Sequence, residues 1–250
     1  MALSRRGVLS LATVGLAATA IRTAAAEVPA LTGEHVTLAS GRSYWLCGAI
    51  SGTAPRPLLL GLPGTGLSAQ NLNLSFWSGT GGWQNHAAAH NYALALCESS
   101  GGTWNVGGGW PSGGHDDRQY LQDVVAHASR TVSPSKVFTA GFSAGGAMAW
   151  AAAAARPDVF AACGMASGWA PIRPTTTMDC YHLHGTSDTT VPIRGGTGVN
   201  AFVFPPAADE ALHAPRGSRV VLYATSGGHA VPGWAAARLF DFFVRDRLIP

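Results

Sequence analysis

The stretch that decides the fold is KVFTAGFSAGGAMAWAAAAARPD, residues 136–158. The apolar run Val137–Ala140 is typical of a buried strand, and the alanine-rich segment Gly145–Ala155 is typical of a helix. Ser143 lies between them in a Gly-x-Ser-x-Gly pattern. Because 32 of the 250 residues are glycine, chance alone supplies about 0.3 such matches. The order of strand, turn and helix is more specific, and it predicts a nucleophilic serine exposed at a sharp turn.

The glycines around Ser143 have a physical reason in such a turn. Gly141, Gly145 and Gly146 leave room where a larger side chain would clash with the strand or the helix. The first N–H groups of the helix have no helical partner, so they can stabilise a developing negative charge. The alternative is a glycine-rich turn whose serine only caps the helix.

A serine hydroxyl needs a base, and the base needs an acid that orients it. Downstream of Ser143, Asp188 follows the apolar run Tyr181–His184, and His229 follows the apolar run Arg219–Ala224. This order predicts Asp188 as the acid and His229 as the base. Taken singly, Asp188 is also compatible with a turn residue and His229 with a helix cap.

Other acids and histidines also follow Ser143. Asp209 and His213 lie in FPPAADEALHAP, which has no predicted strand before it, so they fit the acid and base positions less well. His182 and His184 lie on the predicted strand itself and are expected to be packed rather than catalytic.

Hydrolysis of a carbonyl compound also needs two N–H groups directed at the carbonyl oxygen. Ala144 follows the nucleophile and supplies one. The loop Pro63–Gly66 follows the apolar run Leu58–Leu62, and Thr65 is predicted as the second donor because Pro63 has no N–H. This loop lacks the Lys-Ser/Thr of a phosphate-binding loop.

Four tryptophans lie in loops beside these elements and are candidates for binding an acyl, aromatic or sugar group: Trp104, Trp110, Trp169 and Trp234. Ordinary packing is the alternative for each.

Apolar runs alternate with helical segments along the whole chain, which predicts an α/β fold with a mainly parallel sheet of eight strands flanked by helices. The predicted strands are His35–Ala39, Tyr44–Ile50, Leu58–Leu62, Tyr92–Cys97, Val137–Ala140, Ala162–Ala166, Tyr181–His184 and Arg219–Ala224. The predicted helices are Trp77–Asn91, Arg118–Thr131, Gly145–Ala155 and Gly233–Asp246. Asp116 and Gln119 predict a capping box at the second helix, and Arg156-Pro157 predicts the end of the third.

The N-terminal segment MALSRRGVLSLATVGLAATAIRTAAAE is typical of an export signal. Arg5-Arg6 precedes an apolar run that is too short to span a bilayer, and small residues precede Glu27. We expect residues 1–26 to be cleaved, with a twin-arginine signal favoured over an ordinary secretory one. Residues 27–250 then form one catalytic domain, exported to the periplasm or the extracellular space. They contain neither a repeat nor a Ser/Pro-rich linker.

The composition argues against several kinds of partner. Charged residues make up 12% of the chain and the formal net charge is +3, part of which belongs to the signal, so no nucleic-acid footprint is expected. No later segment predicts a membrane span. No Cys/His spacing typical of zinc is present, and neither a metal nor a cofactor is expected. The even number of cysteines favours disulfides in an exported protein, with small buried thiols as the alternative: Cys47, Cys97, Cys163 and Cys180.

Several motifs together resemble the polyhydroxybutyrate depolymerase-like esterases of the α/β-hydrolase superfamily, a group that includes feruloyl and acetyl-xylan esterases. They are LLLGLPGTG, the Trp-rich loop leading into DDRQYLQDVV, KVFTAGFSAGGAMA, HLHGTSDTTVP and GGHAVPGW, and they run from about Tyr44 to the C-terminus. The resemblance implies an α/β-hydrolase fold. It also implies Ser143 as nucleophile, Asp188 as acid, His229 as base, and Thr65 and Ala144 as N–H donors.

The chain departs from the family pattern in two places. Pro63-Gly64 stands where the family usually has His-Gly, and glycines replace a cysteine often present in the Trp-rich loop. No additional polymer-binding domain follows, which argues against crystalline polyester as the substrate. The resulting prediction is an exported, metal-free serine carboxylester hydrolase for small or oligomeric hydroxyalkanoate, feruloyl or acetyl esters. An acyltransferase with the same triad and a non-catalytic binding protein are the alternatives.

Overall fold

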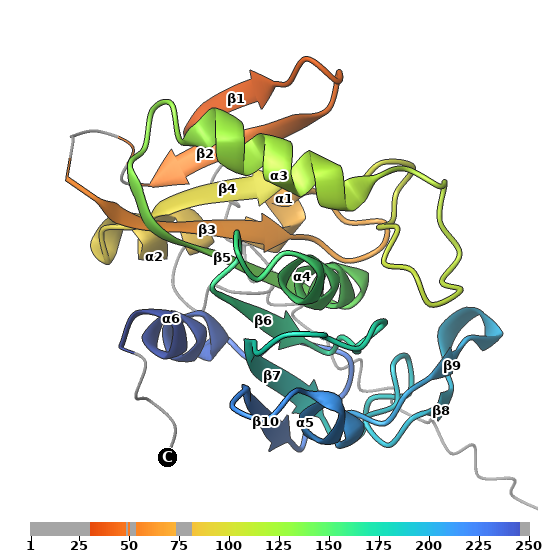
Figure 1. The fold of residues 1–250 in the computed structure, drawn as a ribbon. Coiled ribbons are helices and arrows are strands. Elements are labelled where there is room, and N and C mark those ends of the chain that lie inside the picture. The colour runs from red at the N-terminus through yellow and green to blue at the C-terminus, as the bar shows by residue number, and fades with distance from the viewer. Residues whose placement is uncertain (1–30, 49, 51–53, 74–81, 246–250) are drawn as a thin grey trace, which may run out of the picture.

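The alternating runs form one main sheet of eight strands in the computed structural model, which describes residues 31–48, 50, 54–73 and 82–245 (Figure 1). The expected export signal therefore lies outside the described residues. The strands are β1 (Glu34–Thr37), β2 (Ser43–Gly48), β3 (Arg56–Leu62), β4 (Ala93–Cys97), β5 (Pro134–Phe142), β6 (Ala162–Ala166), β7 (Asp179–Gly185) and β10 (Arg219–Thr225). Each corresponds to a predicted strand, within a few residues at its ends.

The strand order is β1-β2-β4-β3-β5-β6-β7-β10. Only β2 pairs antiparallel with its neighbours β1 and β4, and all other pairs of this sheet are parallel. This confirms the predicted mainly parallel sheet. Because the carboxyl ends of parallel strands meet at one edge, the loops after β3, β5, β7 and β10 come together there.

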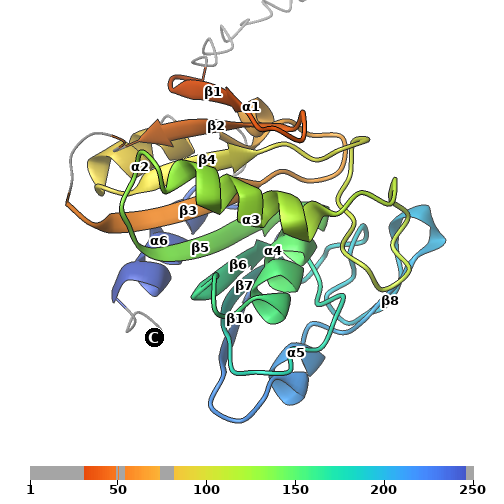
Figure 2. The ribbon, with the colours of Figure 1, turned by 45° about the horizontal axis from the view of Figure 1, so that its top comes forward.

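Helices cover both faces of the sheet, as Figures 1 and 2 show. The helices α3 (Asp117–Ala128) and α4 (Ala144–Ala155) share one apolar core with the sheet, and α2 (Trp83–Ala89) and α6 (Ala235–Arg245) share the other. A sheet buried on both faces needs continuous apolar strands, and every residue of β4 is buried accordingly. Within the described ranges no helix is long and apolar enough to cross a membrane.

The helix ends follow local sequence signals. The Asp116 side chain accepts the Gln119 N–H at 3.0 Å, but the Gln119 side chain donates to Asp123 instead of returning to the cap. The predicted capping box is therefore only half formed. The helix α4 ends at Ala155, directly before Arg156-Pro157, as expected. The predicted helix at 77–91 begins outside the described residues, and its described part contains α2.

The segment between β7 and β10 contains short elements that the sequence did not predict. They are β8 (Gly196–Thr197), the 3-10 turn η2 (Val199–Ala201), the strand β9 (Val203–Phe204) and the helix α5 (Asp209–His213). A further short helix, α1 (Ala69–Asn71), follows β3. Elements of two to five residues are too short to show a periodicity in the sequence. A short strand thus does precede Asp209, contrary to expectation, although it pairs only with β8.

The expectation of disulfides was wrong. All four cysteines are free and buried in strand interiors. Cys47 packs in the core on one face of the sheet, whereas Cys97, Cys163 and Cys180 pack in the core on the other. Cys163 and Cys180 occupy paired positions of β6 and β7. The cysteines act as small apolar residues, the alternative that the sequence had left open.

Candidate active site

Ser143 occupies the sharp turn between β5 and α4. Its backbone has φ 55° and ψ −124°, a conformation that costs a non-glycine residue about 1–3 kcal/mol. Two backbone hydrogen bonds hold it: the Ser143 N–H donates to Ala166 O at 2.9 Å, and Ser143 O accepts the Ala147 N–H at 3.0 Å. The turn projects the side chain away from the sheet edge, as expected for a nucleophile elbow.

Close backbone packing explains the glycines of this turn. A Cβ at Gly145 would overlap the carbonyl oxygens of Leu62 and Pro63, at the end of β3. A Cβ at Gly141 would overlap the Gly145 carbonyl group. Strand β3, the turn and the first residues of α4 can therefore approach each other only without side chains at these positions.

Backbone contacts also fix the loops after β7 and β10 to each other. The Thr186 N–H donates to Thr225 O at 2.7 Å, and the Ser187 N–H donates to Gly227 O at 3.0 Å. A Cβ at Gly185 would overlap the Gly227 carbonyl oxygen. This close pairing brings two residues that are 41 positions apart, Asp188 and His229, into direct contact.

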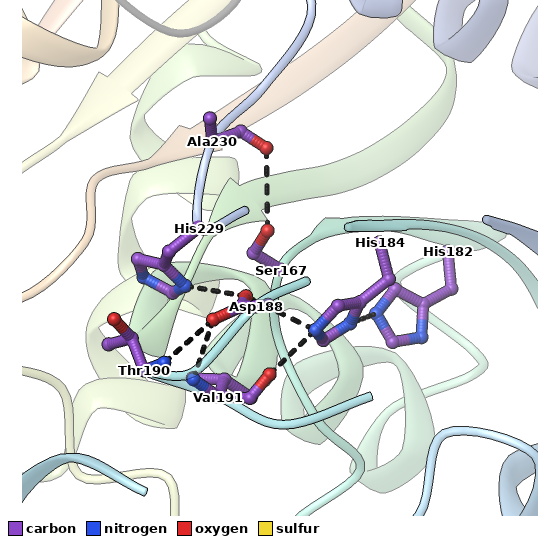
Figure 3. Close-up of polar contacts among 8 residues, drawn as sticks. All are labelled: Ser167, His182, His184, Asp188, Thr190, Val191, His229 and Ala230. Atoms are coloured by element: carbon purple, nitrogen blue, oxygen red, sulfur yellow. Dashed lines mark hydrogen bonds and ion pairs between the residues drawn. The ribbon is translucent and has the colours of Figure 1, made fainter. Parts of the chain in front are cut away.

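The Asp188 carboxylate accepts hydrogen bonds at both oxygens (Figure 3). Oδ1 accepts the N–H groups of Thr190 and Val191, each at 2.9 Å. Oδ2 lies 2.8 Å from His229 Nδ1 and 3.2 Å from His184 Nε2. Burial raises the pKa of Asp188, but the hydrogen bonds from His184, His229 and Val191 outweigh it and hold this pKa below its ordinary value.

Because Asp188 stays ionised and can only accept, His229 Nδ1 must carry a proton. The Nε2 atom of a neutral His229 is then unprotonated and available as a base. The ring lies against the Phe142 ring, with centroids 4.8 Å apart, and its side chain is 19% exposed. Ser167, directly after β6, contacts the loop that carries His229 by donating to Ala230 O at 3.4 Å (Figure 3).

Ser143 and His229 line the same cavity, which has a volume of about 440 Å³. Its other lining residues are mainly apolar or small and come from the end of β5, the turn η2 and the loops around them: Gly64, Thr65, Leu67, Trp110, Phe142, Thr190, Val199 and Asn200. No hydrogen bond joins Ser143 to His229 among these described residues. Such catalytic hydrogen bonds often form only when substrate is bound.

Of the two predicted N–H donors, Thr65 lines this cavity, and Ala144 directly follows Ser143 as the first residue of α4. Within the described residues neither N–H has an assigned acceptor. The Trp-rich loop supports the Thr65 loop, since Thr103 Oγ1 lies 2.8 Å from Thr65 Oγ1 and Gly102 O accepts the Gly66 N–H at 2.8 Å.

Of the four candidate tryptophans, only Trp110 lines the cavity. Trp104 is fully buried, and its Nε1–H donates to Pro63 O at 2.7 Å. Trp169 is buried behind Trp110, with ring centroids 4.8 Å apart. Trp234 is 43% exposed and packs on Tyr223 of the edge strand β10, away from the cavity.

The remaining acids and histidines lie elsewhere. Asp209 and His213 are on α5 and do not line the cavity with Ser143. His182 and His184 are buried in β7, as expected, but His184 contacts Asp188, which the sequence did not indicate. Sequence reasoning also missed Val199 and Asn200 of the cavity wall, because their segment has no regular pattern.

In the part of the chain that the structure describes, no cluster of three or more His, Cys, Asp or Glu is arranged to hold a metal ion.

The mainly parallel sheet, the turn at Ser143 and the meeting of the loops after β7 and β10 define the α/β-hydrolase fold. Residues 115–206 match the family model described as phospholipase/carboxylesterase. The matched segment includes Ser143 and Asp188.

Two kinds of relatives agree with this class. NocK of Nocardia uniformis subsp. tsuyamanensis, described as a candidate esterase, is 31% identical over 151 residues, which cover 56% of this chain and 42% of NocK. The chain therefore matches less than half of that protein's length. The acylaminoacyl peptidase of Pyrococcus horikoshii shares the fold, with 14% sequence identity and a TM-score of 0.59. The match covers 86% of this chain and 41% of that one. Est1E of Butyrivibrio proteoclasticus with ferulic acid bound also shares the fold, with 14% sequence identity and a TM-score of 0.57. The match covers 85% of this chain and 98% of Est1E.

Proposed function

We propose that this protein is a serine carboxylester hydrolase with Ser143 as nucleophile, His229 as base and Asp188 as the orienting acid. The observation that carries the proposal is the 2.8 Å contact between His229 Nδ1 and Asp188 Oδ2 beside the cavity that Ser143 also lines. The match to a carboxylesterase family model and the similarity to NocK support the same class of reaction.

The first half-reaction forms an acyl-enzyme. His229 Nε2 takes the hydroxyl proton as Ser143 Oγ attacks the ester carbonyl, and the N–H groups of Thr65 and Ala144 stabilise the oxyanion. The ester C–O bond breaks, and His229 gives its proton to the departing alkoxide, which leaves as an alcohol. Asp188 stabilises the transient imidazolium and keeps the ring in the reactive orientation.

The second half-reaction releases the acid. Water replaces the alcohol, His229 takes one of its protons, and the resulting oxygen nucleophile attacks the acyl carbon. The bond to Ser143 Oγ then breaks, and the proton on His229 returns to that oxygen. The carboxylic acid departs and the enzyme is regenerated.

The proposed substrates are small hydroxyalkanoate, feruloyl or acetyl esters, as for a polyhydroxybutyrate depolymerase-like esterase. A cavity of about 440 Å³ suits a small acyl group, and the wall formed by Trp110, Phe142 and Leu67 favours apolar or aromatic atoms. Phe202 lies behind this wall, with its ring centroid 5.2 Å from that of Trp110. Export by the N-terminal segment belongs to this proposal, and fractionation of cells that express the full chain tests it.

The test is a panel of p-nitrophenyl esters, methyl ferulate, acetylated xylan and hydroxybutyrate oligomers, with the wild type and Ser143→Ala side by side. We expect ester cleavage by the wild type, none above background by Ser143→Ala, and labelling of Ser143 by a fluorophosphonate. Cleavage that survives the substitution would refute the mechanism. An alcohol acceptor that diverts most product to a new ester would indicate an acyltransferase instead.

A further inference from the structure

A continuous row of titratable side chains extends from Asp188 into the protein, on the side away from His229 (Figure 3). His184 Nε2 lies 3.2 Å from Asp188 Oδ2, and His184 Nδ1 lies 2.9 Å from His182 Nε2. His182 Nδ1 lies 2.7 Å from Glu210 Oε2, on α5. The side chains of all three interior groups are at most 2% exposed. The proposed mechanism does not use them.

One backbone carbonyl determines the direction of these hydrogen bonds. Val191 O lies 2.8 Å from His184 Nε2, and a carbonyl oxygen can only accept. His184 Nε2 must therefore carry a proton, which it shares between Val191 O and the Asp188 carboxylate. Both acceptors lie in the loop that carries Asp188, so the orientation of His184 and the position of that loop depend on each other.

The number of protons in the row follows from these directions. Three links must each contain one proton: His184 to its acceptors, His184 to His182, and His182 to Glu210. Two neutral imidazoles supply only two protons. The three groups therefore bind one additional proton, and their summed charge is zero.

That additional proton has a preferred place. If it stayed on an imidazole, the row would bury an imidazolium and a carboxylate, and both ions would lose hydration. If it lies on Glu210, the carboxylic acid donates to His182 Nδ1, and both imidazoles remain neutral.

We propose that Glu210, His182 and His184 form a buried positioning relay for Asp188, in which Glu210 holds the additional proton and His184 reaches Asp188 as a neutral N–H donor. This inference rests on the proposed function, because it assigns the relay to the acid of that triad. A cation at His184 would compete with the imidazolium of His229 for the same carboxylate oxygen. A neutral donor holds the Asp188 loop without that competition.

Other titratable groups lie around the Glu210 end of the relay. The thiol of Cys180, on β7, faces Glu210, and burial raises its pKa well above the ordinary value, so it stays neutral. Glu210 also lines a cavity of about 30 Å³ together with Asp209, Arg173 and His213. Arg173 Nη2 lies 3.1 Å from His213 Nε2, and because a guanidinium can only donate, that nitrogen is unprotonated.

Kinetics separate the relay from simple packing. Glu210→Gln keeps a donor for His182 Nδ1, so kcat and KM should stay within about twofold of wild type. Glu210→Leu leaves His182 Nδ1 without a partner, and His182→Leu does the same to His184 Nδ1. Both should lower kcat roughly tenfold with KM nearly unchanged. The control His127→Leu removes a histidine hydrogen bond to Tyr44, on another part of the sheet, and should leave kcat unchanged.

Proton NMR with histidine labelling tests the relay without reference to activity. With ¹⁵N-labelled histidine, and apart from the proton on His229 Nδ1, the relay of the wild type should show two nitrogen-bound protons and one low-field proton without nitrogen coupling. Glu210→Gln should lose only the proton without nitrogen coupling. Only two relay protons in the wild type, a third relay proton that is coupled to nitrogen, or a kcat for Glu210→Gln as low as that for Glu210→Leu would overturn the proposal. If the wild type cleaves no ester but shows the three protons, the proposed function fails and the proton count stands. If Glu210→Leu does not fold, the comparison of wild type with Glu210→Gln still decides.

Discussion

Replacing Asp188 by asparagine preserves the shape of the side chain and exchanges one acceptor oxygen for an NH₂ group. In the wild type the carboxylate faces four donors: the N–H groups of Thr190 and Val191 at Oδ1, and those of His229 and His184 at Oδ2. The amide oxygen can satisfy the two backbone donors. Its NH₂ group must then face two nitrogens that carry protons in the wild type.

The consequence for His229 sets the magnitude. An amide NH₂ facing Nδ1 favours the tautomer with the proton on Nε2, and that tautomer offers no base to Ser143. We expect kcat to fall roughly a thousandfold to ten-thousandfold, with KM changed little, which corresponds to about 4–5.5 kcal/mol. The control Asp179→Asn changes a half-buried carboxylate that is paired with Arg219 at 3.7 Å and lies at the start of β7, the strand before the Asp188 loop. It should stay within about twofold of wild type.

The assay is initial-rate cleavage of a p-nitrophenyl ester at pH 7–8, with urea unfolding of each variant as a check on folding. The structure also predicts a pH dependence for stability. The pKa of Asp188 is lower in the folded chain than the ordinary value of about 3.9. Its contribution is therefore complete above about pH 4 and is lost as the pH falls toward the folded pKa. The stability difference between wild type and Asp188→Asn should thus shrink below about pH 4. A kcat loss of less than tenfold in a folded variant would refute the assigned role of Asp188.

Three further predictions follow from packing. Gly145→Ala should abolish activity and lower the melting temperature, because its Cβ would overlap two carbonyl oxygens. The control Gly146→Ala should lower the melting temperature clearly less, because its Cβ would lie 3.1 Å from the nearest atom. A thiol reagent should label Cys47 in denaturant and not in the native protein at pH 8, since burial raises the pKa of Cys47 to about 12. Labelling of the native protein as fast as that of an exposed cysteine would contradict the packing. Trp110→Ala should raise KM for aryl esters about tenfold, whereas Trp234→Ala should not change it, and equal effects on KM would argue against the assigned cavity wall.

Local patterns made most of the fold predictable. The eight strands of the main sheet, the ends of α4 and the turn at Ser143 follow from apolar runs, glycines and a proline, which act over a few residues. The order of Ser143, Asp188 and His229 along the chain was sufficient to predict that they would meet. In a parallel sheet, loops after successive strands open at the same edge whatever their length.

The cavity walls were harder to predict. The short elements between β7 and β10 contribute Val199 and Asn200, and nothing in their composition indicates where the segment folds back. Of four tryptophans with similar neighbours in sequence, only Trp110 reaches the cavity, because its place depends on packing against Trp169 and Phe202.

The sequence by itself determined the class of fold and the identity of the three proposed catalytic residues, because both depend on local geometry and chain order. Only the tertiary structure decided that the cysteines are free thiols and that Glu210, on an unpredicted helix, joins His182 and His184 behind Asp188. Such contacts depend on the distances between segments that are far apart in the chain. Those distances are fixed by how the two cores pack, and no short stretch of residues encodes them.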